Sequence, residues 1–210
     1  MSQTSPPPPP AAAASAGGDY PVTLDLTSPN QVPRWQPFVG FILVLPHIVV
    51  LYGLALWAEI ATFVSFFTIL FTKDVPDWAF RANVRVRRYS WRVMSYAVFL
   101  RPGYPPFEFD ADPIDQSSDP AKFSMVKPVE YKRFLPLIKW LLVFPHLIVL
   151  GVLVACTYSI VGLIAFFSVL FTGHWPEGLR NFVIGIFRWS TRVNAYAGLM
   201  VDDYPPFSLH

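Results

Sequence analysis

A long apolar stretch over residues 38–71 limits what this chain can fold into more than any other feature. Its only ionisable residues are His47 and Glu59. As one helix the stretch would be about 51 Å long, which overshoots a bilayer core of about 30 Å. Two crossings joined by a turn would need about 40 residues. We therefore weigh a tight hairpin of two short helices, turning near residues 53–59, against one long helix, and the hairpin is favoured.

The composition indicates a membrane protein. Hydrophobic residues make up 53% of the chain and charged residues 14%, whereas a soluble domain carries about 25% charge. This excludes a disordered chain, a collagen-like chain and an ordinary soluble enzyme. The 16 basic and 14 acidic residues leave a net charge of +2, which gives no indication of a nucleic-acid partner.

The second half of the chain repeats the first. The offset is 99 residues before a one-residue insertion in the second copy and 100 residues after it. The recurring motifs are LPH at 45–47 and FPH at 144–146, LFT at 70–72 and 170–172, R-x-S-x-R at 88–92 and 188–192, and YPPF at 104–107 and 204–207. Each unit combines an apolar segment, a basic amphipathic helix and an extended YPPF end. We expect the two units to pack about a pseudo-twofold axis.

These motifs resemble a bacterial membrane protein family, the domain-of-unknown-function family 4389, which is common in actinobacteria. The resemblance covers residues 20–210. The first repeat departs from the family pattern by carrying Glu59 and the additional arginines Arg81, Arg85 and Arg87. The resemblance implies a membrane location and no established activity, so it transfers no catalytic residue to this chain.

The expected fold is an all-α integral membrane protein with minor extended segments. Residues 1–19 are rich in Pro and Ala and are predicted to be a disordered tail. Membrane repeat 1 is expected at 20–109, an acidic, turn-rich linker at 110–121, and membrane repeat 2 at 122–210. Residues 20–26 alternate apolar and polar side chains as a short strand does, and these residues and the YPPF segments are candidates for strand pairing.

Arginines mark one stripe of the helix that is predicted within residues 73–101, and two of them recur in the second repeat. The candidates for lipid or anion binding are Arg81, Arg85, Arg88 and Arg92, with Arg188 and Arg192. Paired guanidiniums one helical turn apart can face one phosphate, so lipid headgroups are one hypothesis. The other is internal pairing with carboxylates. The carboxylates considered are Glu59, Asp74, Asp77, Asp202 and Asp203.

Three ionisable residues in the apolar stretches are further candidates. His47 and His146 occupy equivalent positions after a proline, and paired imidazoles are weak candidates for haem ligands. The local alternative is that each histidine bonds to a backbone carbonyl that the proline frees. Glu59 is a candidate for proton or cation transport, because a carboxylate in an apolar stretch is costly. It needs no such role if it lies at a turn or pairs with an arginine.

We expect a non-enzymatic membrane protein, because the sequence has no nucleophile elbow, Gly-rich phosphate loop or H-E-x-x-H motif. The predicted role is an accessory or membrane-organising component that engages anionic lipids or a partner protein. The alternatives are a small transporter or channel that uses Glu59 and the repeat interface, and a haem-binding redox subunit. No cofactor is expected.

The distribution of positive charge predicts the topology. Lys and Arg lie mostly around the two apolar stretches, and such segments stay cytoplasmic. A multi-pass protein of the bacterial cell membrane with both termini in the cytoplasm follows from the hairpin. The single cysteine, Cys156, allows no intramolecular disulfide and no cysteine-based zinc site. The oligomeric state does not follow from the sequence.

Overall fold

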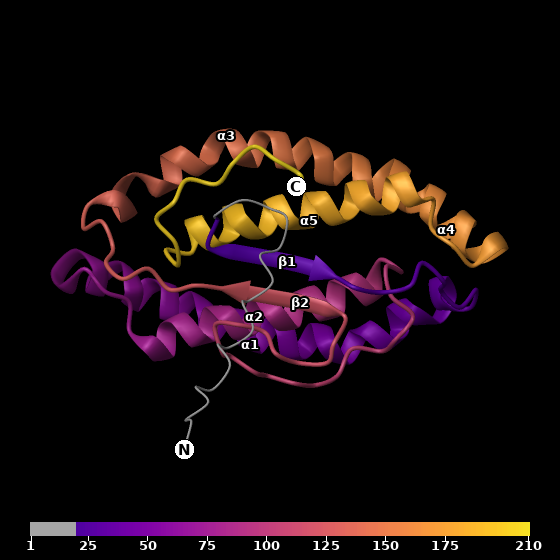
Figure 1. Ribbon diagram of the computed structural model, residues 1–210, viewed down its shortest axis with the longest axis horizontal. Coiled ribbons are helices and arrows are strands. Elements are labelled where there is room, and N and C mark those ends of the chain that lie inside the picture. Colours follow the sequence, from indigo (N-terminus) through magenta and orange to yellow (C-terminus); the bar gives the residue numbers. More distant parts are fainter. Residues whose placement is uncertain (1–19) are drawn as a thin grey trace, which may run out of the picture.

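The computed structural model describes residues 20–210, so the predicted tail at 1–19 lies outside the described residues. The elements in chain order are β1 (Val22–Leu26), α1 (Gln36–Thr72), α2 (Asp77–Ala97), β2 (Ala121–Met125), α3 (Leu135–Cys156), the π-helical turn η1 (Thr157–Val161), α4 (Gly162–Thr172) and α5 (Glu177–Ala197). The described chain is mostly helical, with β1 and β2 forming one small sheet (Figure 1). The segment α3–η1–α4 runs as one long helix.

The favoured hairpin is wrong, because each apolar stretch forms a single long helix. Helix α1 has 37 residues, and the helix from Leu135 to Thr172 has 38 residues. Gly53 lies within α1 and does not end it. One glycine costs a helix only about 1 kcal/mol relative to alanine, and its neighbours Leu51, Leu54 and Ala55 favour helix. The chain turns only at Lys73, which has the left-handed φ of 59°.

Two helical hairpins face each other across the small sheet. Helix α1 packs against α2, and α3 packs against α5. The hairpins are related by an approximate twofold axis that runs close to the viewing direction of Figure 1. The two long helices lie at the outer edges, and β1 and β2 lie between the hairpins. The expected pseudo-twofold arrangement of the repeats is therefore present.

The strands are exchanged between the repeats. Strand β1 precedes the first repeat but packs on α5 of the second, whereas β2 precedes the second and packs on α2 of the first. Equivalent hydrogen bonds fix both contacts: Arg88 Nε donates to the Phe123 carbonyl over 3.1 Å, and Arg188 Nε donates to the Leu24 carbonyl over 2.9 Å. The two strands pair antiparallel, from Val22 opposite Met125 onward. The predicted strand at 20–26 is confirmed, whereas the YPPF segments form no strand.

The one-residue insertion in the second repeat coincides with η1. An extra residue would rotate every later side chain of a helix by about 100°, but one wider π-turn absorbs it. The buried positions show the result. Val44 and Val143 match at the offset of 99 before η1, and Ile69 and Val169 match at the offset of 100 after it. Equivalent positions of the two repeats are therefore buried along the whole length of both long helices.

The segment 110–121, expected to be a linker, is part of the folded core of the first repeat. Asp115 is fully buried and lies between two arginines of α2, 3.1 Å from Arg88 Nε and 3.5 Å from Arg92 Nη2. Asp119 pairs with Arg101 over 2.6 Å. The loop has no regular secondary structure, as its turn-rich sequence predicts, but its carboxylates neutralise guanidiniums that the fold has buried. It therefore fixes β2 against α2 rather than separating two units.

Arg88, Arg92, Ser117 and Phe123 surround the Asp115 carboxylate, and we call this arrangement the Asp115 cage. The cage lowers the pKa of Asp115. Burial alone would raise the pKa of this carboxyl, but hydrogen bonds from the Ser117 hydroxyl and amide and the Phe123 amide, together with the Arg88 guanidinium, outweigh it, and the pKa lies below its usual value. A lowered folded-state pKa stabilises the fold above the unfolded pKa of about 3.9. That contribution is lost as the pH falls through the folded-state value.

Replacing the buried carboxylate should destabilise the protein. Asp115→Asn leaves Arg88 and Arg92 buried with less countercharge, and we expect the free energy of unfolding to fall by about 3–5 kcal/mol. The measurement is denaturation in mild detergent followed by circular dichroism. Asp112→Asn is the matched control, because Asp112 pairs with Arg81 at the exposed surface of the same loop, and exposed pairs contribute little. Equal effects of the two substitutions would contradict the buried cage.

Candidate functional site

The two long helices expose apolar side chains over one broad side of the molecule. Only 17% and 11% of the residues in the most apolar window of each long helix are buried, so most apolar side chains of these helices lie at the surface. Both are long and apolar enough to cross a membrane. We call this surface the apolar face. Its prominent members are Phe38, Phe41, Leu45, Val49, Tyr52 and Phe63 of α1, and Leu141, Phe144, Leu147, Val152, Leu163 and Phe171 of α3 and α4.

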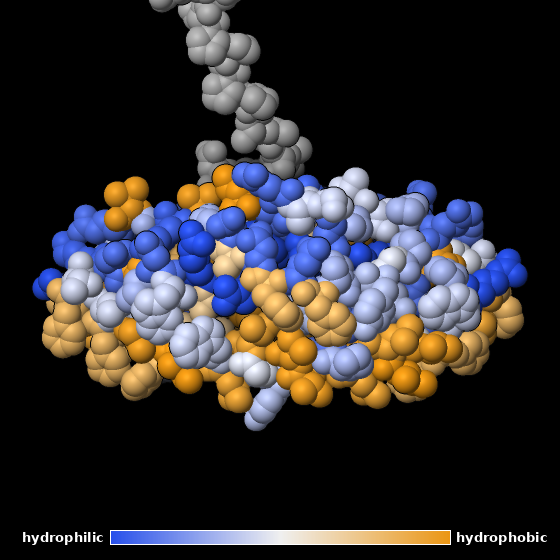
Figure 2. Space-filling view, turned by 90° about the horizontal axis from the view of Figure 1, so that it is seen from below, coloured by the Kyte–Doolittle hydropathy of each residue, from blue (hydrophilic) through white to orange (hydrophobic). Residues whose placement is uncertain are grey.

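The apolar face and a polar face form opposite sides of the molecule. Figure 2 shows hydrophobic residues along one broad side and hydrophilic residues along the other. Figure 1, which looks down the shortest axis, shows both long helices at nearly full length. The helices thus lie along the apolar face rather than pointing through it. A contiguous apolar surface of this extent marks contact with lipid or another protein.

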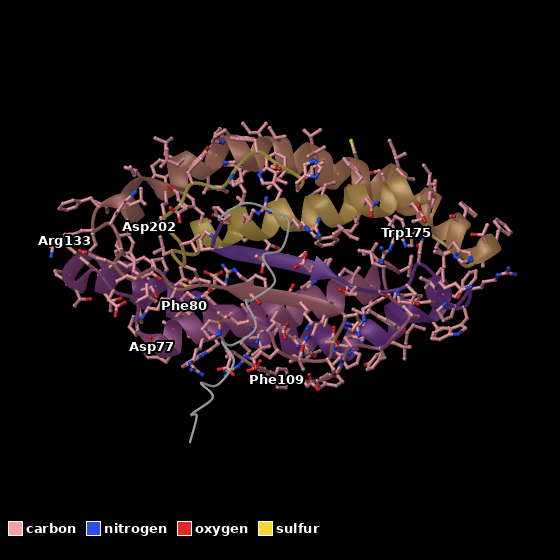
Figure 3. The ribbon with its side chains drawn as sticks, viewed as in Figure 1. Asp77, Phe80, Phe109, Arg133, Trp175 and Asp202 are labelled. Atoms are coloured by element: carbon pink, nitrogen blue, oxygen red, sulfur yellow. The ribbon has the colours of Figure 1, made fainter. Side chains whose placement is uncertain are left out.

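The arginines that were candidates for lipid binding have different surroundings. Arg88 and Arg92 are buried and share Asp115. Arg88 also pairs with Asp110 and Arg92 with Glu108, so the anions that these guanidiniums face belong to the protein itself. Arg81 and Arg85 reach the surface, where Arg85 Nε donates to the Phe109 carbonyl over 2.8 Å. Of the carboxylates considered as partners, none pairs with these arginines among the described residues. Asp74 and Asp77 pair with Lys127, and Asp202 pairs with Lys139. Figure 3 labels Asp77 and Asp202, which both lie towards the left end of the molecule in that view.

The equivalent arginines of the second repeat, Arg188 and Arg192, have different partners. Arg188 Nη2 lies 3.2 Å from Asp25 Oδ1, on the exchanged strand β1. The Arg192 guanidinium lies 5.9 Å from the centre of the Tyr20 ring, and no carboxylate of residues 20–210 forms an ion pair with it. The cage around Asp115 is therefore specific to the first repeat within the described chain.

The histidines lie in two separate aromatic clusters, one in each repeat. His47 stacks on Phe107 with ring centres 4.2 Å apart, and His146 stacks on Phe207 at 3.9 Å. His47 Nδ1 shares a hydrogen bond with the Tyr89 hydroxyl, and His146 Nδ1 accepts one from the Trp189 indole over 3.1 Å. Each imidazole is fully buried under the YPPF segment of its own repeat, so the histidines serve the packing of these segments.

The YPPF tyrosines also complete the turn that proline disturbs in each long helix. The Tyr104 hydroxyl donates to the Leu43 carbonyl and the Tyr204 hydroxyl to the Leu142 carbonyl, both over 3.2 Å. Each carbonyl lies three residues before the helix proline, Pro46 or Pro145, whose ring distorts the preceding turn. The local alternative for the proline–histidine motif is wrong in this respect: neither histidine bonds a backbone carbonyl, because Nδ1 of each bonds to an aromatic side chain and Nε2 has no partner among the described residues. The carbonyl that each proline frees lies four residues before it, one residue before the carbonyl that the tyrosine bonds.

A cavity of about 860 Å³ lies between the two repeats. Residues from both hairpins line it, and Ala55, Glu59 and Tyr158 on its border are exposed, so it opens between the long helices. The aromatic pair of Trp91 and Phe187, with ring centres 5.2 Å apart, joins the repeats at the same place. The volume lies within the range of about 300–1,000 Å³ that small-molecule sites occupy.

Two charged side chains line this cavity, Arg87 and Glu59. The Arg87 guanidinium crosses between the repeats: Nη1 donates to Asn83, and Nη2 donates to the Asn194 carbonyl over 2.8 Å. Its Nε is buried and has no hydrogen-bond partner among the described residues. Burial lowers the pKa of Arg87 to about 10, and the nearby Glu59 carboxylate opposes this change. Arg87 therefore remains a cation at neutral pH.

The sequence singled out Glu59 but not Arg87. Arg87 was noted only as one additional arginine of the first repeat, outside the stripe of Arg81 and Arg85. A usable signal was its repeat counterpart, Phe187, because a charge that replaces an aromatic residue at an otherwise repeated position marks a local specialisation. What the sequence could not supply was the approach of Asn194 from the other repeat.

The close fit of Arg87 against the second repeat predicts different effects of two glycine substitutions. A Cβ added at Gly198 would clash with Arg87 Nη2, whereas one added at Gly53 would meet no atom within 4 Å. We expect Gly198→Ala to lower the free energy of unfolding by about 1–3 kcal/mol and Gly53→Ala to raise it by up to about 1 kcal/mol. Thermal denaturation of both variants tests this. A stabilising Gly198→Ala would contradict the contact.

The comparison with known proteins agrees with the repeat structure. The domain of unknown function DUF4389 matches the chain at residues 34–108 and again at 136–208. Each matched segment contains a long helix, its partner helix and a YPPF end, and neither contains β1 or β2. No curated protein and no solved structure matches the chain. The resemblance that the motifs indicated is thereby confirmed, and the chain belongs to the DUF4389 family, with two copies of its domain.

Proposed function

We propose that this protein is a non-enzymatic membrane protein that inserts its apolar face into one leaflet of a bilayer, with α1 and α3–α4 lying in the membrane plane. The observation that carries the proposal is the apolar face itself, which extends along both long helices while the opposite side is polar (Figure 2). Burial of such a surface in hydrocarbon is favoured by about 25 cal/mol for each Å² removed from water.

The polar face favours long helices that lie in the membrane plane over long helices that cross the membrane. Helix α2 and the acidic loop lie alongside α1 over much of its length (Figure 1). If α1 crossed the bilayer, exposed charges such as Arg81 and Asp112 would enter the hydrocarbon with it, at about 2.5–3.5 kcal/mol each near the centre. The irregular backbone of the loop would also lose its access to water. An in-plane position avoids both costs.

Exposed tryptophans support the same position. Tryptophan concentrates at the boundary between headgroups and hydrocarbon, because its ring is apolar and its N–H is polar. The exposed indoles are Trp35, Trp57, Trp78 and Trp140. They belong to α1, α2 and α3 or to the turn before α1, so indoles are available along the molecule where the apolar face meets water.

The expected cellular role is that of an accessory or membrane-organising component. Arg88 and Arg92 are already paired with carboxylates of the protein, so attraction to anionic lipids would rest on basic residues that reach the surface, such as Arg81 and Arg85. We therefore expect apolar insertion to dominate, with neutral vesicles bound nearly as well as anionic ones. A transporter that uses Glu59 would need a path across the bilayer, which an in-plane arrangement does not favour.

Charges placed on the apolar face should weaken membrane binding without unfolding the protein. Val49 and Val152 are exposed on the two long helices, and the double substitution Val49→Lys with Val152→Lys should reduce co-flotation with phosphatidylcholine vesicles roughly tenfold or more. Val129→Lys is the control, because Val129 is an exposed apolar residue in a loop outside these helices. Undiminished flotation of the double variant would rule out the apolar face as the contact.

The in-plane orientation predicts equal depth along one helix. Cys156 is the single cysteine and is exposed on α3, so it can carry a fluorophore, and Leu137→Cys or Phe171→Cys can be added to a Cys156→Ser background. Quenching by lipids that carry nitroxides at known depths should give similar shallow depths at all three positions. A deep label at residue 156 with shallow labels at 137 and 171, accessible from opposite sides, would instead establish a membrane-crossing helix.

A further inference from the structure

Both charged side chains that line the cavity between the repeats come from the first repeat. Repeat 1 contributes Glu59 and Arg87, whereas the equivalent positions of repeat 2 hold Tyr158 or Ser159 and Phe187. The second repeat contributes apolar side chains such as Val154, Phe166 and Ile186. Its polar lining side chains, such as Ser190, Thr191 and Asn194, are uncharged. The approximate twofold symmetry is therefore broken where the cavity lies. A molecule with a polar head and an apolar tail would match this division.

The two charged groups share the cavity without pairing. Glu59 forms no salt bridge and no side-chain hydrogen bond within residues 20–210. Arg87 hydrogen-bonds only to the uncharged groups of Asn83 and Asn194, and the Nε of its guanidinium remains unpartnered. Their charges are close enough to influence each other but lie farther apart than a direct ion pair. This leaves space for a group that carries both a negative and a positive charge.

The helical turn at the wall of the cavity is also unusual. The π-turn η1 contributes Thr157 and Tyr158 to the lining, and Gly162 follows directly. Such single π-turns are frequent at functional sites, because the wider turn alters the side chains that it presents. The second repeat thus carries its one-residue insertion at the cavity, opposite the charged residues of the first repeat.

We propose that this cavity binds one phospholipid that bears a primary ammonium group, with its phosphate at Arg87, its ammonium at Glu59 and its acyl chains along the wall of the second repeat. The inference rests on the proposed insertion of the apolar face into a membrane, since the cavity opens between the helices that form this face. Guanidinium donors suit phosphate oxygens, and a carboxylate accepts hydrogen bonds from an ammonium group. Ligand and site then neutralise each other.

Binding is tested with short-chain lipids and the full chain in a detergent that contains no phosphate. Dihexanoyl-phosphatidylethanolamine is titrated while the fluorescence of the protein is followed, since Trp91 and Trp175 line the cavity. Dihexanoyl-phosphatidic acid, which lacks the ammonium, and O-phosphoethanolamine, which lacks the chains, are titrated in parallel. We expect saturable binding of the first, at least tenfold tighter than of either other compound.

The variants separate the two charged contacts. Glu59→Gln changes an exposed residue and should preserve the fold while the preference for phosphatidylethanolamine over phosphatidic acid falls at least tenfold. Arg87→Gln should weaken both lipids, and Arg81→Gln, on the same helix outside the cavity, should alter neither. An unchanged lipid preference in Glu59→Gln overturns the assignment, even if Arg87→Gln fails to fold.

The failure of this inference can be told apart from that of the proposed function. Tight binding of O-phosphoethanolamine would mean that a free metabolite, not a lipid, is the ligand, and would overturn the proposal for the cavity. Absence of saturable lipid binding in a chain that still floats with vesicles would overturn the cavity alone. Selective lipid binding by a chain that does not co-float with vesicles would overturn the proposed insertion of the apolar face. The assignment of the cavity would then remain.

Discussion

The ion pairs of Arg88 and Arg92 with Asp115 stabilise the rest of the polar face. It holds the loop that precedes β2 against α2, and β2 in turn pairs with β1 from the other repeat. Because both guanidiniums and the Asp115 carboxylate are buried, removing that carboxylate would leave Arg88 and Arg92 with only the partly exposed partners Asp110 and Glu108, which is costly for buried charges. These arginines of α2 are thus directed into the protein, and the opposite side of the molecule consists mainly of apolar side chains.

The two repeats share their packing but differ in their chemistry. The proline–histidine motif, the stacked YPPF phenylalanine and the exchanged strand occur twice with nearly the same distances. These features bury apolar area and satisfy backbone groups, and such needs are the same in both copies. Arg87, Glu59 and η1 each occur once, and all three line the cavity between the copies. The cage around Asp115 also occurs once, but it stabilises the fold, whereas Arg87, Glu59 and η1 meet at a space that the fold leaves unfilled.

Much of the fold followed from the sequence because it depends on local patterns. The repeat, the two long apolar elements, a helix after each of them and the strand at 20–26 are properties of spacing and composition. The choice between a hairpin and one helix was missed, since Gly53 and Glu59 weaken a helix too little to break it. The acidic segment at 110–121 was read as a linker because its partners, Arg88 and Arg92, are distant in sequence. Arg87 was passed over for a similar reason: its neighbours Asn194 and Gly198 come from the other repeat.

The exchange of strands has a consequence for how such a domain can exist by itself. A single copy would carry a strand that fits the helix of another copy, while its own helix would lack a strand and its sheet would keep an unpaired edge. Two separate molecules could satisfy both needs by lending each other their first strands, which gives a closed, twofold dimer. In the present chain the covalent connection between the copies replaces that association, so that assembly no longer depends on protein concentration, and the two halves are free to become unequal.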